Sequence, residues 1–168
     1  PVTLDLPAVL EAPVTFSRLG ADLRWQRESA GWRLSAERLD WVMASIAGHG
    51  RFALQLPDAN DTSPVLDLDA NFAADDALDA RPYMPRHWPD SLKAWLTRSI
   101  IAGRVPRGEL RIQGPLADFP FHARPTGEWS LGLDVADAAL DFAPGWPRLD
   151  DIRARLLFRG NGLTITSD

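Results

Sequence analysis

Apolar and polar residues alternate along the chain from Gly103 to Ile165, and this pattern constrains the fold more than any other feature. A period of two residues is typical of a β-sheet with one dry and one wet face, because successive side chains of a strand point to opposite sides. If the chain supplies a cover for the apolar face, that face is core; if it does not, the face is a binding surface. The alternating apolar positions are Trp129, Leu131, Leu133 and Val135, then Ala138, Leu140 and Phe142, then Ile152, Ala154, Leu156 and Phe158.

Residues 1–74 have the same character and predict an N-terminal β-meander. Gly20 is expected to interrupt its first run, and a turn is expected at 28–31, where Gly31 can adopt a positive φ. A polar loop at 57–64 is expected to join two alternating runs into a long hairpin. The predicted strands cover Val14–Ser17, Leu23–Gln26, Trp32–Ala36, Leu39–Ile46, Arg51–Leu56 and Leu66–Phe72.

Residues 75–102 predict a proline-rich connector followed by one amphipathic helix. Residues 75–80 are expected to form a helical turn, and Arg81-Pro-Tyr-Met-Pro85 is expected to be irregular, because proline restricts the residue before it. Pro89 suits a first helical turn, Asp90 complements the helix dipole, and Gly103 is a good stop. The residues expected to pack or cap this helix are Trp88, Leu92, Trp95, Leu96 and Ile100.

The prediction is therefore a mainly β chain with a C-terminal β-meander at 103–168. One helix of roughly 14 residues is about 20 Å long and covers a few strands, not a sheet of eight or more. The remaining apolar face must meet a second sheet, as in a sandwich, or stay open as a curved groove. We expect an extended, twisted antiparallel sheet curled into an apolar groove, with the helix inserted near 88–102.

Composition excludes several classes of function. Hydrophobic residues make up 45% of the 168 residues and the formal net charge is −5, which argues against disorder and against nucleic-acid binding. The chain contains no cysteine, no apolar run long enough to span a membrane and no signal peptide. None of its three histidines forms a local metal pair, and Asp67 and Asp69 fit the wet side of a strand. We expect no catalytic residue, metal or cofactor, and no enzyme activity.

An ordered series of motifs resembles the YhdP-type proteins of the AsmA-like group, which also contains TamB. The resemblance is strongest over 80–167, and the first half of the chain is similar only in its style of strands. The motifs are Arg81-Pro-Tyr-Met-Pro85, Trp88-Pro89, Leu92, Trp95-Leu96, Gly103, Gly108-Glu-Leu-Arg-Ile-Gln-Gly114, Asp118-Phe-Pro-Phe121, Gly127-Glu-Trp-Ser130, Ala138-Ala-Leu-Asp-Phe142, Trp146-Pro147, Ile152 and Leu163-Thr-Ile165.

The resemblance implies a role in lipid transport. Such proteins are long, anchored in the inner membrane of Gram-negative bacteria, and cross the periplasm as a twisted β-sheet that conducts phospholipid toward the outer membrane. The chain, whose two ends look cut, would then be an internal segment of a longer polypeptide. Its partners would be phospholipid or another acyl-chain ligand and other segments of the same chain, with membrane contact made elsewhere in the protein.

Three hypotheses about function remain open from the sequence. The first is a lipid-conducting groove, the second a closed structural or interaction module of the cell envelope, and the third a carbohydrate-binding protein or enzyme that uses Trp25, Trp32, Trp129 or Trp146 beside paired carboxylates. Each groove candidate could equally be ordinary core. The candidates for the lipid groove are Leu110, Ile112, Leu131, Leu133, Val135, Leu140, Phe142, Ile152, Leu156, Phe158, Leu163 and Ile165.

Overall fold

A single eight-stranded antiparallel sheet dominates the fold, and its strands are neighbours in the order in which they follow along the chain. The computed structural model describes residues 1–4, 12–59, 62–84, 90–121, 123–160 and 162–167, without the side chain of Leu92. The sheet contains β3 (Arg18–Glu28), β4 (Gly31–Met43), β5 (Ile46–Pro57), β6 (Val65–Ala74), β7 (Ile100–Pro115), β8 (Glu128–Leu140), β9 (Leu149–Arg159) and β10 (Gly162–Thr166). Outside it lie the two-stranded sheet of β1 (Val2–Leu4) and β2 (Val14–Phe16), the 3₁₀ helices η1 (Ala77–Tyr83) and η2 (Leu116–Asp118), and α1 (Asp90–Ser99).

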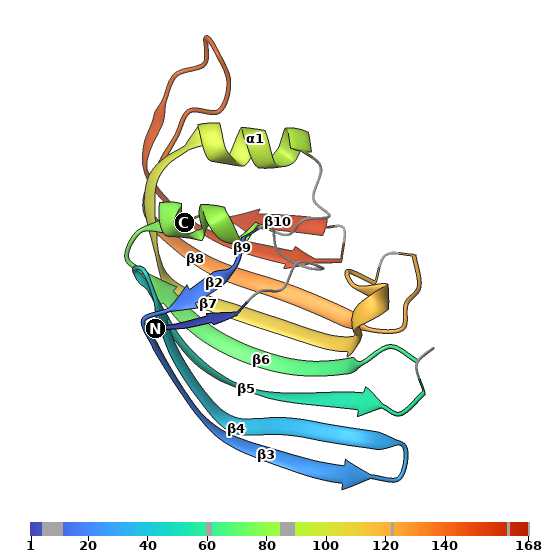
Figure 1. Ribbon diagram of the computed structural model, residues 1–168. Coiled ribbons are helices and arrows are strands. Elements are labelled where there is room, and N and C mark those ends of the chain that lie inside the picture. The colour runs from blue at the N-terminus through green and yellow to red at the C-terminus, as the bar shows by residue number, and fades with distance from the viewer. Residues whose placement is uncertain (5–11, 60–61, 85–89, 122, 161, 168) are drawn as a thin grey trace.

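The large sheet is curved and open. Its long strands bend so that their inner side faces α1, η1 and the β1–β2 pair, and β3 and β10 form its two edges (Figure 1). The sheet therefore does not close into a barrel, and no second sheet of comparable size faces it within the described residues. The predicted fold class, a mainly β chain built on one extended antiparallel sheet with an inserted helix, is confirmed.

Bulges keep the apolar residues on one face where the alternation changes phase. In β8 the apolar positions shift from odd to even numbers between Val135 and Ala138, and the register with β9 shifts at the same place. Asp137 has a φ of 52° there, which accommodates the extra residue. Two alternating runs at 129–135 and 138–140 therefore form one strand. In β4 a register shift between Ala36 and Leu39 has the same effect.

Aromatic rings lie over glycines on this face. A Cβ atom placed on Gly48 would overlap the indole of its cross-strand partner Trp41, and one placed on Gly108 would overlap the ring of its partner Phe72. The absence of a Cβ lets each ring lie over the backbone of the neighbouring strand. The two glycines therefore make room for the aromatic side chains on this face.

The buried core is small and sits at one end of the apolar face. Ile46, Ala74 and Val105 form its buried centre, and Ala77 and Tyr83 of η1 pack against them. The accessible surface of the chain is 10,764 Å². A compact monomer of this mass exposes only about 8,200 Å² by the usual scaling of surface with mass. The large excess means that most of the curved sheet is a single layer.

The structure corrects several predicted boundaries. The helix begins at Asp90 and ends at Ser99, instead of running to residue 102, because residues from Ile100 onward pair with β8. The strand expected at 39–46 is the end of β4 and the start of β5, separated by a turn. Gly20 does not interrupt β3. Residues 81–83 are not irregular but complete η1, whose φ values suit Pro82.

Candidate functional site

The sheet register places apolar side chains in rows that cross all eight strands. One row contains Leu19, Trp41, Gly48, Phe72, Gly108, Leu133, Leu156 and Ile165, each paired with the next across neighbouring strands. A second row contains Ala21, Leu39, Gly50, Ala70, Leu110, Leu131, Phe158 and Leu163. Each row runs from the open edge at β3 to the open edge at β10. We call the surface formed by these rows the apolar face.

The predicted groove residues lie together on the C-terminal half of this sheet. All except Phe142 are in β7–β10, and Phe142 lies two residues beyond Leu140, the last residue of β8. Leu131 pairs with Leu110 and Phe158, and Leu133 pairs with Leu156. The remaining pairs join Ile112 to Trp129, Val135 to Ala154, Ile152 to Ala138, Leu140 to Leu149, Leu163 to Phe158 and Ile165 to Leu156.

The apolar face also includes residues of β3–β6 that were not among the predicted groove residues. A third row joins Leu23, Ala36, Phe52, Leu68, Ile112 and Trp129. Trp25 pairs with Leu34, which pairs with Leu54. The sequence pattern that marks an apolar strand face is present at these positions, because they belong to the alternating runs of the N-terminal meander. Only the register shows that they continue the rows of the C-terminal strands.

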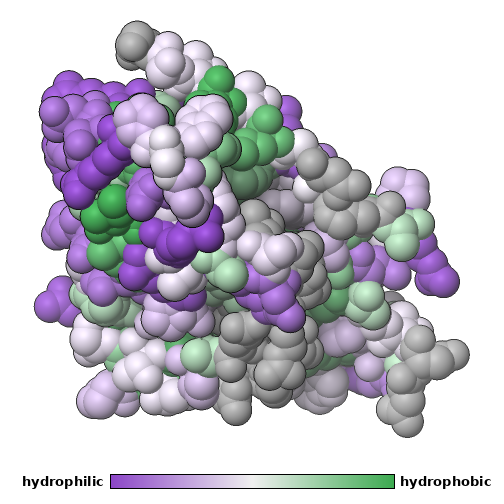
Figure 2. All heavy atoms as spheres, turned by 90° about the horizontal axis from the view of Figure 1, so that it is seen from above, coloured by the Kyte–Doolittle hydropathy of each residue, from purple (hydrophilic) through white to green (hydrophobic). Residues whose placement is uncertain are grey.

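Much of the apolar face is accessible. Its larger side chains are half-buried or exposed, apart from Ile46 and Val105 at the end covered by η1. Exposure is greatest at the two edges, where Leu23 is 62% and Ile165 is also 62% exposed. In the view onto the side that carries α1, apolar side chains reach the surface in separate patches between hydrophilic ones (Figure 2). The described residues outside the sheet thus bury only part of this face.

The opposite face of the sheet is neutralised by ion pairs. Asp69 of β6 accepts hydrogen bonds from Arg111 of β7 and Arg51 of β5. The hydrogen bond from Arg111 is the main reason that the pKa of Asp69 is lowered, and the contact with Arg51 adds to it against the effect of partial burial. Further pairs extend this network over β7–β9, joining Arg107 to Glu109 and Arg155 to both Asp134 and Glu109. We call this surface the polar face.

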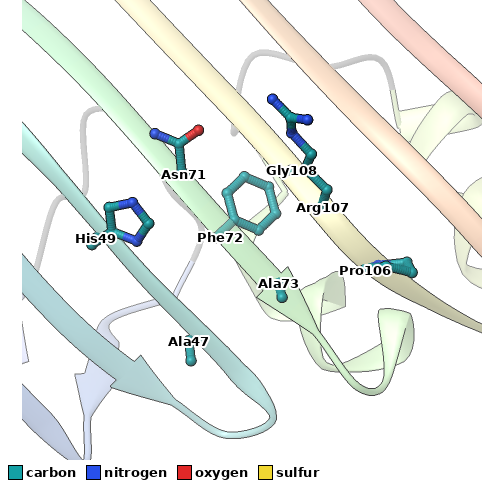
Figure 3. A pocket seen from close by; sticks show the side chains of 8 residues that line it. All are labelled: Ala47, His49, Asn71, Phe72, Ala73, Pro106, Arg107 and Gly108. Carbon is teal, nitrogen blue, oxygen red and sulfur yellow. The ribbon is translucent and has the colours of Figure 1, made fainter.

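A shallow hollow of about 450 Å³ lies between β5, β6 and β7. Its lining includes His49, Asn71 and Arg107 beside the small side chains of Ala47 and Ala73 (Figure 3). Arg107 is already paired with Glu109, so the hollow carries no strong uncompensated charge. Within the described residues no group of acidic, histidine or cysteine side chains could hold a metal ion. The described residues that line the hollow therefore do not suggest a catalytic or metal site.

Comparison with known proteins identifies the family of the chain. A family described as YhdP protein matches residues 1–168, the whole length of the chain. The chain belongs to the YhdP protein family. It is 26% identical over 161 residues to the intermembrane phospholipid transporter YhdP of Escherichia coli strain K12. That alignment covers 95% of this chain but only 12% of the relative. No solved structure matches the chain.

The helix α1 of this YhdP-family chain packs against the loop after β8. The ring of Trp95 contacts Phe142 edge-on at 5.6 Å, and its Nε1 donates a hydrogen bond to the carbonyl oxygen of Phe142 at 3.0 Å. Phe142 also packs against Trp146. Of the other residues predicted to pack the helix, Leu96 is half-buried, and Ile100 is the first residue of β7. Trp88 and the side chain of Leu92 lie outside the described residues.

Among the described residues, Trp25, Trp32 and Trp129 do not form a sugar-stacking platform beside paired carboxylates. Trp25 and Trp32 are 5.6 Å apart but inclined by 35°, and Arg27 lies over the Trp32 ring. The nearby carboxylate, Asp58, is held by Arg27 through two hydrogen bonds, which lower its pKa. Trp129 is half-buried near Phe119. This part of the family's fold therefore gives the carbohydrate hypothesis no support.

Proposed function

We propose that this chain is a segment of an inner-membrane-anchored periplasmic bridge protein whose curved apolar face forms a groove for phospholipid acyl chains. The observation that carries the proposal is a long apolar face whose larger side chains are mostly half-buried or exposed in the described part of the chain. The family membership and the name of the E. coli relative support phospholipid as the cargo. The relative's transport activity belongs to a protein about eight times longer, so the segment would supply one stretch of the path.

The dimensions of the apolar face suit an acyl chain. Seven spacings of about 4.8 Å between eight strands make the sheet about 34 Å across. One leaflet of a membrane has a hydrocarbon thickness of about 15 Å, half of a typical core. Rows of apolar side chains that run from edge to edge would let a chain move across strands without crossing a charge. Each methylene removed from water contributes about 0.8 kcal/mol, so no hydrogen-bonding residue is needed to hold it.

The open ends of the rows favour transport over storage. Leu19 and Ile165 end the same row at opposite edges of the sheet, and both are exposed. Neighbouring segments of a longer chain that continued the sheet at β3 and β10 would extend the rows on both sides. In the described part of the chain no helix is long and apolar enough to cross a membrane. The membrane anchor and the placement in the periplasm therefore remain part of this proposal.

The alternative function, a closed β structural or interaction module without lipid, needs a sealed core. The buried cluster of Ile46, Ala74 and Val105 occupies only the end of the sheet near η1. The strands from β7 to β10 keep half-buried and exposed apolar side chains. The open sheet favours the lipid-binding proposal over this alternative.

Native mass spectrometry of the purified protein, combined with lipid extraction, tests the proposal. Leu156 and Leu157 are adjacent in β9 but lie on opposite faces, because Leu156 pairs with Leu133 and Leu157 with Gly132. We expect phospholipid to copurify with the wild-type protein and with Leu157→Asp, and to be lost from Leu156→Asp. Circular dichroism checks that both variants keep their strands. A lipid-free wild-type protein that also takes up no added fluorescent phospholipid would contradict the proposal.

A further inference from the structure

Arg81 differs from the other described arginines in its surroundings. Arginines on the polar face are exposed and paired with carboxylates, as Arg51 and Arg111 are with Asp69. Arg81 is half-buried in η1, and its Nη2 donates a hydrogen bond to the carbonyl oxygen of Ile100. Among the described residues no carboxylate pairs with it, and its buried Nε has no acceptor. Among the described residues its guanidinium therefore has one hydrogen-bond acceptor and no ion pair.

The position of Arg81 places this charge beside the apolar face. The helix η1 lies on the inner side of the curved sheet (Figure 1). Its residues Ala77 and Tyr83 pack on the buried cluster at the end of that face. Arg81 lies between them in sequence, and its acceptor Ile100 is the first residue of β7, paired with Leu140. A lipid on the apolar face would meet this cation at the end of the sheet that η1 covers.

The junction between α1 and β7 holds one further donor without a described partner, and one acidic residue, Asp141, is bound to the junction through its backbone. Ser99, the residue before Ile100, is fully buried, and its Oγ has no hydrogen-bond partner among the described residues. The Ser99 carbonyl accepts from the backbone N–H of Asp141 at 2.8 Å. The Ser99 hydroxyl is sealed inside the protein, so the guanidinium of half-buried Arg81 is the group at this junction that a ligand can reach. A guanidinium suits a ligand that is rich in acceptor oxygens and negatively charged.

Physical chemistry identifies the class of ligand. A half-buried cation beside apolar surface loses hydration, and an anion that binds it offsets that loss. Arginine presents its donors in a planar fork that matches the oxygens of a phosphate group. A phospholipid combines such a phosphate with acyl chains that need an apolar surface.

We propose that Arg81 binds the phosphate group of a phospholipid whose acyl chains lie on the apolar face. This inference rests on the proposed function and adds to it a headgroup contact at the end of the sheet covered by η1. Inorganic phosphate shares the headgroup chemistry but lacks the acyl chains. The lipid is therefore expected to bind far more tightly than phosphate alone.

Tryptophan fluorescence titrations with three probes test the inference: dioctanoyl phosphatidylglycerol, dioctanoylglycerol and inorganic phosphate. The two lipids have the same acyl chains and differ in the phosphate-bearing headgroup. We expect the wild-type protein to bind the phospholipid roughly tenfold more tightly than the diacylglycerol, the size expected for a charged hydrogen bond. Arg81→Gln is expected to remove this preference and leave diacylglycerol binding unchanged.

Arg98 provides the matched control, because it is exposed in the last turn of α1 and has no ion-pair partner among the described residues. Arg98→Gln removes the same charge near the same junction and is expected to keep the preference. Arg81→Lys keeps the positive charge and is expected to keep part of the preference for the phospholipid. It therefore serves as a second variant if Arg81→Gln does not fold.

Each contrary result has a separate meaning. Equal binding of the two lipids by the wild-type protein would overturn the headgroup contact and leave the acyl-chain proposal standing. Equal losses in Arg81→Gln and Arg98→Gln would also overturn it, because the effect would then be general electrostatics. Inorganic phosphate that displaced the phospholipid at equal concentration would assign the site to free phosphate. Failure of the wild-type protein to bind either lipid would contradict the proposed function itself.

Discussion

The indole of Trp41 lies over Gly48 on the neighbouring strand, in a space that a Cβ atom on Gly48 would occupy. Phe72 lies over Gly108 in the same row of the apolar face. Each ring spans two strands and fills the surface that its glycine partner leaves free. These contacts give a surface lacking a deep core part of its order, because aromatic burial is among the larger contributions that one side chain makes.

Substitution of these glycines is expected to destabilise the sheet. Gly48→Ala and Gly108→Ala would force the rings of Trp41 and Phe72 from their positions, at a cost of about 1–3 kcal/mol in the free energy of unfolding. Urea denaturation measures this cost. Gly132 on β8 is the control, because a Cβ atom there would meet its nearest neighbours at an ordinary 3.9 Å. Gly132→Ala is expected to be neutral or slightly stabilising; equal losses in all three variants would refute the role of the rings.

The contact between Trp95 and Phe142 is expected to hold α1 against the loop after β8. Trp95→Ala removes both the ring contact and the hydrogen bond from Nε1, whereas Trp95→Phe removes only the hydrogen bond. Hydrogen exchange of the amides in 90–99 should therefore quicken strongly in the first variant and weakly in the second, with little change in β4 and β5. Unchanged exchange in Trp95→Ala would mean that other contacts position the helix.

The stabilising effect of Asp69 should depend on pH. Its pKa is lowered in the folded protein, chiefly by the hydrogen bond from Arg111 and then by Arg51. A lowered pKa stabilises the folded state above the ordinary carboxyl value of about 3.9 and ceases to do so as the pH falls through the folded value. We expect Asp69→Asn to lower the free energy of unfolding by about 1 kcal/mol at pH 7.

The same pair of proteins should become equally stable in acid, well below pH 4, where Asp69 is protonated in both the folded and unfolded states. Urea denaturation of wild type and Asp69→Asn at several pH values measures the difference. Asp67 is a suitable control, because it lies on the same face of β6 but is exposed and forms no ion pair with a described residue. A difference between wild type and Asp69→Asn that did not change with pH would contradict the electrostatic explanation.

The sequence predicted the strands better than their ends. Alternation identified one face of β8 and β9 correctly, because a sheet with two unlike faces imposes that period on its residues. The helical stripe of Trp95, Leu96 and Ile100 extended past the true end at Ser99, since pairing of Ile100 with Leu140 outweighs local helix preference. No local pattern could reveal that pairing, which joins residues 40 positions apart.

The candidate site was predicted in part for the same reason. Leu131 and Leu133 alternate visibly, so the C-terminal strands were selected directly from the sequence. Phe52 and Leu68 alternate just as clearly, but only the register shows that they share a row with Ile112. The contact of Trp41 with Gly48 and the unpaired charge of Arg81 depend on neighbours brought together by the fold, and single-sequence patterns do not contain them.

Site-specific photocrosslinking tests the central claim most directly. A photoreactive phenylalanine derivative placed at Leu133, on the apolar face, is compared with one at Asp134, the next residue on the polar face, in the protein exposed to radiolabelled phospholipid. The lipid-groove account predicts label at position 133 and background at position 134, with the same contrast between 156 and 157. Equal labelling of both faces, or none at 133 and 156, would contradict the claim that acyl chains lie on the apolar face.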